Sequence, residues 1–169
     1  MKHLKLLAVV VALAAVPGSL LIRRALTEES RREPLRSGPA PAFSLEATDG
    51  ATVSSSSFAG RPAVVHFFAS WCKPCRDEVA VLDAARQKHP DLAVVGVVVR
   101  DDPADAGRAA RELGLRWPLV LDPDEETARA WGVDSAPVTF FVGADGGITG
   151  RLIGPVNRLT LDRQLQRIL

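Results

Sequence analysis

Cys72 and Cys75, the two cysteines of this 169-residue chain, stand three positions apart in the segment FFASWCKPCRDEVAVL. Their type and spacing allow a structural disulfide, a metal site or reversible thiol–disulfide exchange. A disulfide between them closes a very small ring and restricts the unfolded chain little, which disfavours a purely structural bridge. A zinc site needs four ligands, whereas the sequence offers one Cys pair and His3, His66 and His89. Thiol–disulfide exchange is therefore the favoured interpretation.

The place of the pair in the chain also favours a reactive thiol. Cys72 is expected where a buried strand ends and a helix begins, so its sulfur would face unpaired backbone N–H groups and the positive end of the helix dipole, which stabilise a thiolate. Lys73 and Arg76 add positive charge nearby. Cys75 lies one turn inside the helix, where it should be more buried. We predict that Cys72 attacks a disulfide and that Cys75 resolves the intermediate.

The elements that must position this pair follow from the apolar pattern. Residues 63–69 and 92–99 have the composition of buried strands, and residues 73–89 between them have helical spacing. The pattern further predicts a hairpin over 42–53 turning at Asp49-Gly50, a loop with one helical turn over 54–62, helices over 103–113 and 124–131, strands over 118–121, 138–142 and 147–154, and a last helix after Asn157 that buries Leu161, Leu165, Ile168 and Leu169. This alternation predicts an α/β domain with a mixed central sheet and helices on both faces.

The N-terminal part of the chain has a different character. Lys2 and Lys5 precede an uncharged stretch from Leu6 to Ile22, the pattern of an export signal. The segment Ala12-Leu13-Ala14 resembles a small-residue cleavage site and favours removal, whereas the apolar residues that continue to Ile22 favour a retained membrane anchor. We expect a signal peptide or anchor at residues 1–22, a flexible tether at 23–40 and the folded domain at 41–169.

Charge and export limit the partners. Residues 1–40 carry seven Lys or Arg and three Asp or Glu, which leaves 14 against 17 for residues 41–169. The domain is therefore mildly acidic, and nucleic acid is not an expected partner. Outside the cytoplasm thiols meet oxidising conditions, so two cysteines in an exported chain usually form a disulfide.

Three motifs, FFASWCKPC, SAPVTFFV and GADGGI, together resemble the thioredoxin superfamily, and specifically its TlpA/ResA/CcmG type. The resemblance covers residues 38–169, including the insertion over 94–133. Members of this type are membrane-tethered or periplasmic thiol:disulfide oxidoreductases. The resemblance implies a thioredoxin-like fold with an N-terminal β-hairpin and a helix–strand insertion, and no cofactor beyond the redox-active Cys72–Cys75 pair.

The resemblance also implies a set of substrate-binding residues. Pro137 matches the family's cis-proline, beside which the backbone of Ala136 pairs with an extended substrate segment while the proline ring keeps metals off the sulfurs. The alternative is an ordinary proline at the start of a strand. Trp71 matches the aromatic that shields the active site and would otherwise be a core aromatic. Pro74, between the cysteines, completes the set.

Two further residues are candidates for proton transfer. Glu78 matches the acidic position three residues after the second Cys, which in ResA-like members tunes the acidity of the thiols and shuttles protons; its alternative is a solvated helix residue. His66, six residues before the first Cys, departs from the family pattern. It would lie in the central strand near Cys75 and accept its proton with a pKa near the working pH. The alternative is a core histidine bonded to a backbone carbonyl.

The resemblance implies reduction of disulfides in exported proteins, such as the haem-binding CxxC pair of apocytochrome c. The domain would lie on the periplasmic side of the inner membrane or free in the periplasm, with electrons from a membrane thiol transporter. A general disulfide reductase and a disulfide-forming oxidase use the same site. A different class, a copper chaperone that binds metal through the dithiol, is disfavoured by Pro137.

Overall fold

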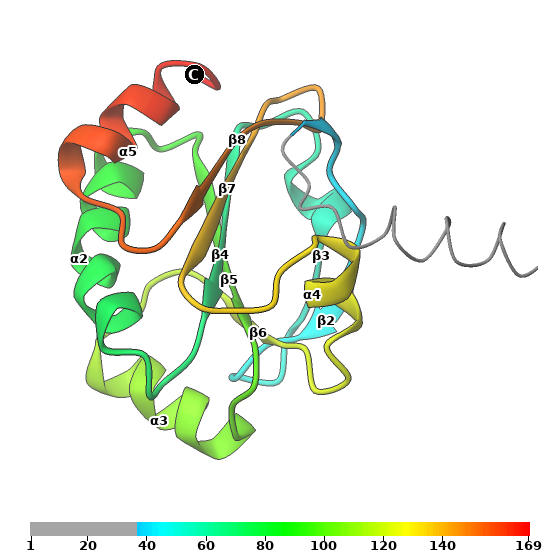
Figure 1. The fold of residues 1–169 in the computed structure, drawn as a ribbon, viewed down its shortest axis with the longest axis vertical. Coiled ribbons are helices and arrows are strands. Elements are labelled where there is room, and N and C mark those ends of the chain that lie inside the picture. Colours follow the sequence, from blue (N-terminus) through cyan, green and yellow to red (C-terminus); the bar gives the residue numbers. More distant parts are fainter. Residues whose placement is uncertain (1–36) are drawn as a thin grey trace, which may run out of the picture. The chain divides into compact units, whose positions relative to one another are not determined.

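The computed structural model describes residues 37–169, where six strands form one sheet (Figure 1). Their order is β1-β8-β7-β4-β5-β6. The strands at its centre are β4 (Ala63–Phe68), β5 (Ala93–Val98) and β7 (Val138–Val142). Because β4 pairs in parallel with β5 and antiparallel with β7, the sheet is mixed, as predicted.

The other elements surround this centre. β6 (Leu119–Leu121) lies parallel to β5, β8 (Gly147–Ile153) lies antiparallel to β7, and the short β1 (Gly38–Pro39) pairs with β8. A separate hairpin consists of β2 (Ser44–Glu46) and β3 (Thr52–Ser54), followed by the 3-10 helix η1 (Ser55–Phe58). The helices are α2 (Lys73–Lys88), α3 (Pro103–Glu112), α4 (Glu126–Ala130) and α5 (Arg158–Leu165).

Side chains of β4 alternate between the two faces of the sheet. Val64 and Phe68 belong to a buried cluster with residues of α2, α3 and α5, on what we call the α2 face. Val65 and Phe67 belong to a second cluster with the hairpin and Trp131, on what we call the hairpin face. Figure 1 shows α2, α3 and α5 on one side of the sheet and the hairpin with α4 on the other. Helices thus lie on both faces, although on the hairpin face the short α4 shares the cover with the hairpin.

Gly96 in β5 allows a close approach on the α2 face. A Cβ atom at this position would lie 2.6 Å from Leu119 Cδ1 and 2.8 Å from Trp117 Cζ3. Any side chain there would therefore displace Trp117. The register partner of Gly96 on β4 is His66, so the missing side chain leaves room for the indole beside the imidazole.

The predicted elements are present, and two details differ. Gly38 and Pro39, expected in the tether, instead form β1 by pairing with Ile148 and Gly147 at the edge of the sheet. The last helix begins after Asn157 and buries Leu161, Leu165 and Ile168 as expected. Leu169 is exposed, which corrects the prediction, because α5 ends at Leu165 and the helical face does not continue to the final residue.

The predicted export segment at residues 1–22 and most of the tether lie outside the described residues. From residue 37 to residue 169, no helix is both long enough and apolar enough to cross a membrane.

Candidate functional site

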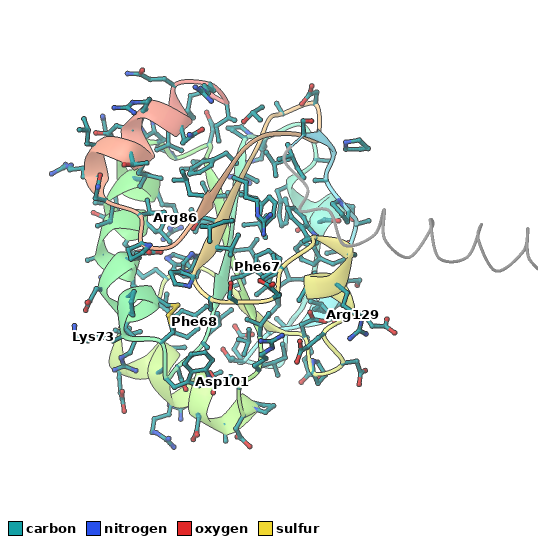
Figure 2. All side chains as sticks on the ribbon, viewed as in Figure 1. Phe67, Phe68, Lys73, Arg86, Asp101 and Arg129 are labelled. Carbon is teal, nitrogen blue, oxygen red and sulfur yellow. A yellow bond between two sulfur atoms is a disulfide. The ribbon has the colours of Figure 1, made fainter. Side chains whose placement is uncertain are left out.

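Cys72 and Cys75 form a disulfide at the start of α2, with an S–S distance of 2.05 Å (Figure 2, yellow bond). Cys72 is the N-cap residue of the helix, as predicted, and its Sγ accepts a hydrogen bond of 3.2 Å from the backbone N–H of Cys75. Pro74 lies in the first turn, where the missing N–H of proline costs nothing. Both cysteines are buried, Cys75 completely and Cys72 with 4% exposure. The slightly more exposed cysteine is thus the one at the helix terminus.

The helix terminus is the main source of positive potential at Cys72. Lys73 Nζ lies 2.7 Å from Asp77 Oδ2, and Arg76 Nη2 lies 3.0 Å from a carboxylate oxygen of Glu112. Because both cations are paired with carboxylates, they add less field at the sulfur than the sequence alone suggests. The unpaired N–H groups of the first turn have no such compensation.

The peptide bond between Ala136 and Pro137 is cis, which confirms the match of Pro137 to the family's cis-proline. Ala136 packs against the buried cluster that contains Cys72 and Cys75. Neither backbone hydrogen-bonding group of Ala136 has a partner among residues 37–169. This segment therefore offers a free donor and a free acceptor beside the dithiol.

Trp71 is a surface residue. Its side chain is 62% exposed, so the alternative of a core aromatic is wrong. The indole Nε1 donates a hydrogen bond of 2.9 Å to the backbone carbonyl of Arg100. An exposed aromatic held in place next to Cys72 is suited to contact another protein, because its large apolar area is already ordered.

Glu78 and His66 meet in the interior beside α2. Both side chains are buried, and His66 Nδ1 lies 3.5 Å from Glu78 Oε2. The same ring nitrogen lies 3.0 Å from the hydroxyl oxygen of Thr139, and the backbone N–H of Val156 donates to Glu78 Oε1 at 2.7 Å. Glu78 also lies one helical turn after Cys75 on the buried face of α2. Two titratable side chains thus lie in the interior, one of them a single helical turn after Cys75.

Local structure explains this meeting. His66 stands at an even-numbered position of β4 and therefore points to the α2 face, together with Val64 and Phe68. Thr139 of β7 is its direct antiparallel partner. The imidazole also contacts Trp117 edge to face, at 6.5 Å between ring centroids.

Burial shifts both pKa values of the pair. Loss of hydration raises the pKa of Glu78 from 4.5 to about 7, against the opposing effect of the hydrogen bond from Val156. Burial lowers the pKa of His66 from 6.5 to about 4. At neutral pH the imidazole is therefore uncharged, and Glu78 is divided between its two protonation states.

Several sequence expectations for the pair need correction. The expected pKa of His66 near the working pH is wrong, and it is Glu78 that titrates there. The alternative of Glu78 as a solvated residue is also wrong, because the side chain is buried. His66 is bonded to a hydroxyl rather than to a backbone carbonyl. Thr139 was not predicted from the sequence, although it is the one polar residue of the strand VTFFV.

Within the part of the chain that the structure describes, no three or more His, Cys, Asp or Glu side chains are grouped so that they could hold a metal ion. The two sulfurs are bonded to each other.

Known proteins share this fold and motif. The AhpC/TSA family matches residues 37–151. The thiol:disulfide interchange protein CycY of Rhizobium leguminosarum bv. viciae is 37% identical over 107 residues, which are 63% of this chain and 57% of CycY, so the match spans little more than half of that relative. The thiol:disulfide interchange protein DsbE of Allochromatium vinosum is 32% identical over 139 residues, 80% of this chain and 76% of DsbE.

A solved structure agrees with these sequence relatives. A thiol:disulfide interchange protein of the thioredoxin family from Chlorobium tepidum superposes with a TM-score of 0.71 at 28% identity, over 79% of this chain and 97% of the other. The cysteine pair at a helix start, the cis-proline segment and these matches agree with one another. The chain belongs to the AhpC/TSA family and is a thiol:disulfide oxidoreductase with a thioredoxin-like fold.

Proposed function

We propose that this oxidoreductase reduces disulfides in exported proteins on the extracytoplasmic side of the membrane, with the CxxC pair of apocytochrome c as a substrate. The observation that carries the exchange chemistry is the placement of Cys72 Sγ at the N-terminus of α2, where a stabilised thiolate can attack a disulfide. The direction of electron flow depends on the reduction potential of the pair. The charged and apolar N-terminal sequence supports export. The relatives DsbE, CycY and ResA support disulfide exchange as the reaction.

The reaction begins with the reduced protein. The Cys72 thiolate attacks one sulfur of the substrate disulfide, a mixed disulfide forms, and the other substrate sulfur leaves and takes up a proton. Cys75 then loses its proton and attacks Cys72 Sγ. The Cys72–Cys75 disulfide forms, and the second substrate sulfur leaves as a thiol. Two electrons pass to the substrate, and a membrane thiol transporter returns them.

Glu78 is the acceptor that we assign to the proton of Cys75. It follows Cys75 by one turn on the buried face of α2, and a pKa of about 7 lets its carboxylate take a proton near neutral pH. His66 is less suited to this step, because protonation would create a buried cation. The Val156 N–H orients the carboxyl group through Oε1, and His66 lies 3.5 Å from its other oxygen as an uncharged neighbour.

The substrate chain lies in extended form beside the cis-proline. Its backbone pairs with the free N–H and carbonyl of Ala136, next to Pro137. Trp71 and Pro74, both exposed and adjacent in sequence to the cysteines, supply apolar contact to the substrate. A backbone-paired substrate can vary in sequence, so a general reductase uses the same arrangement.

Trapping of partners tests this function. In the Cys75→Ser variant the mixed disulfide at Cys72 cannot be resolved, so bound substrates accumulate and can be identified after non-reducing electrophoresis. We expect c-type cytochromes among the trapped proteins. The matched control, Cys72→Ser, should trap at least about a hundredfold less, because Cys75 is completely buried.

Three results would contradict the proposal. Trapping through Cys75 rather than Cys72 would reverse the assigned roles. If the trapped proteins are exported proteins but include no cytochrome, the protein is a general reductase and has no role in cytochrome maturation. Tight binding of one equivalent of Cu(I) by the reduced protein, with no trapped partner, would support the copper chaperone instead.

A further inference from the structure

The segment that follows β5 is tied to the segment that leads into the cysteine pair. β4 and β5 are parallel, so their carboxyl ends lie at the same edge of the sheet. The backbone N–H of Val99 donates to the carbonyl of Phe68 at 3.0 Å, which extends the pairing beyond the two strands. Figure 2 shows Asp101 at the same end of the molecule as Lys73, where α2 begins.

Asp101 continues this connection with its side chain. Its Oδ2 accepts the backbone N–H of Ser70, and its Oδ1 accepts the Ser70 hydroxyl at 2.9 Å. Oδ1 also accepts the backbone N–H of Asp102 at 3.0 Å, which fixes the rotamer of the carboxylate. Hydrogen bonds to an ionised acceptor are the stronger kind. Ser70 is therefore held from two atoms at a position two residues before Cys72.

The residue before Asp101 holds Trp71. The Arg100 carbonyl accepts the indole N–H, and Arg100 has a φ of 51°, a left-handed conformation that costs a non-glycine residue about 1 kcal/mol or more. Arg100 Nε also lies 3.4 Å from Glu125 Oε2. Strained backbone of this kind persists where neighbouring contacts fix it, and here the contacts on both sides of Arg100 do so.

We propose that Asp101 is a positioning residue of the disulfide exchange reaction: by holding Ser70, and with it the Trp71 indole against the Arg100 carbonyl, it keeps the protein-docking surface beside Cys72 in one geometry. This inference rests on the proposed contact of Trp71 with protein substrates. The hydrogen bonds of Asp101 go to Ser70 and Asp102 and not to the sulfurs, so we expect its effect on docking rather than on the exchange of sulfur atoms. Because the Trp71 indole is already ordered, it loses little conformational entropy when a substrate protein binds.

The experiment compares Asp101→Ala, Asp101→Asn and the matched control Asp102→Asn in the full-length protein. Asp102 is the adjacent residue, and its side chain caps α3 through the N–H of Ala104, a role that asparagine performs equally well. Reduction of insulin measures docking of a protein disulfide. Reduction of 5,5′-dithiobis(2-nitrobenzoate) measures the reactivity of Cys72 toward a small disulfide that needs no docking surface.

We expect Asp101→Ala to raise KM for insulin about five- to tenfold, because charge-assisted hydrogen bonds are lost. The rate toward the small disulfide should change by less than about twofold. Asp101→Asn keeps an acceptor and should raise KM about twofold. Asp102→Asn should match the parent protein. Fluorine NMR after incorporation of 5-fluorotryptophan adds a second readout, with Trp71→Phe to assign the signal.

The Trp71 signal should broaden or divide in Asp101→Ala, while the signals of the buried Trp117 and Trp131 stay in place. Parent-like KM and an unchanged Trp71 signal would overturn the inference. The inference would also be overturned if Asp101→Ala slowed reduction of insulin and of the small disulfide equally and displaced the signals of all three tryptophans. That result would indicate a general loss of structure. If Asp101→Ala does not fold, Ser70→Ala removes the hydroxyl bond alone, and an unchanged KM and Trp71 signal in it would overturn the inference. Failure of the parent protein to reduce either disulfide would instead contradict the proposed function.

Discussion

The two faces of the sheet differ in what they bury. On the hairpin face, Phe67, Phe140 and Trp131 form a cluster of aromatic rings with centroids 4.9 to 5.9 Å apart. On the α2 face, the same two strands present His66 and Thr139 to Glu78. Alternation along a strand lets neighbouring residues serve different purposes. Both faces therefore supply apolar packing, and the α2 face also carries the buried polar groups behind the dithiol.

This division has an energetic side. Burying polar and titratable groups is costly even when they are hydrogen-bonded, and it is their pKa shifts that record the cost. The aromatic cluster on the hairpin face buries large apolar surfaces in favourable edge-to-face contacts, which stabilise the fold. We infer that apolar burial on both faces offsets the cost of the buried pair.

Removal of one tryptophan from each face gives the largest expected difference. Trp131→Ala and Trp117→Ala should each lower the free energy of unfolding by about 3 to 5 kcal/mol, because both indoles are buried. Only Trp117 contacts His66, so only its loss should admit water to the pair and lower the pKa of Glu78. Urea unfolding and the pH dependence of insulin reduction measure the two effects. An altered pH dependence in Trp131→Ala would contradict the division between faces.

The buried pair should have a characteristic effect on stability. The raised pKa of Glu78 gives stability at low pH that is lost as the pH rises from 4.5 through about 7. The lowered pKa of His66 gives stability above pH 6.5 that is lost as the pH falls through about 4. Between pH 4.5 and 6.5 both the folded and the unfolded pair hold one proton, so the two trends cancel.

Single variants should separate these opposite trends. In His66→Asn the free energy of unfolding should fall with rising pH between about 4.5 and 7, and in Glu78→Gln it should rise between about 4 and 6.5, by about 1 kcal/mol per pH unit relative to the parent. Unfolding is measured on the oxidised protein, since disulfide-bonded cysteines do not titrate. Parallel pH dependences in both variants and the parent would show that the pair is not coupled to folding.

A smaller effect is expected from an exchange of polar and apolar residues between the faces. Thr139→Val removes the hydroxyl bond to His66 and should destabilise the protein by about 1 to 2 kcal/mol while shifting the pH dependence of stability. Val138→Thr is the control, since it places a hydroxyl in the apolar cluster of the hairpin face. It should destabilise by about 1 to 3 kcal/mol with no shift in pH dependence. If the pH dependence of stability shifted equally in both variants, the distinction between the two faces would be contradicted.

Much of the fold could be predicted from the sequence. The apolar runs of β4, β5 and β7 and the capping residues Cys72, Asp102 and Asn157 locate the elements, because strand burial and helix capping are local properties. β1 was not predicted, since Gly38 and Pro39 form a strand only through pairing with β8. Pairing partners 108 and 110 residues away leave no local pattern in such a short segment.

The site divides in the same way. The cysteine pair and the cis-proline are recognisable from short motifs. The direction of the pKa shifts cannot be predicted from such motifs, because it depends on how completely the fold buries His66 and Glu78. The contacts of Thr139 and Val156 join segments far apart in the chain and could not be deduced from spacing alone.

The reduction potential of the Cys72–Cys75 pair tests the central claim, that the dithiol at the start of α2 acts as a reductant. It is measured at pH 7 by equilibration with dithiothreitol buffers and alkylation of the free thiols. The account predicts a value of about −230 mV or lower, toward that of thioredoxin, which favours transfer of electrons to substrate disulfides. A value near about −120 mV, as in disulfide-forming oxidants, would contradict it.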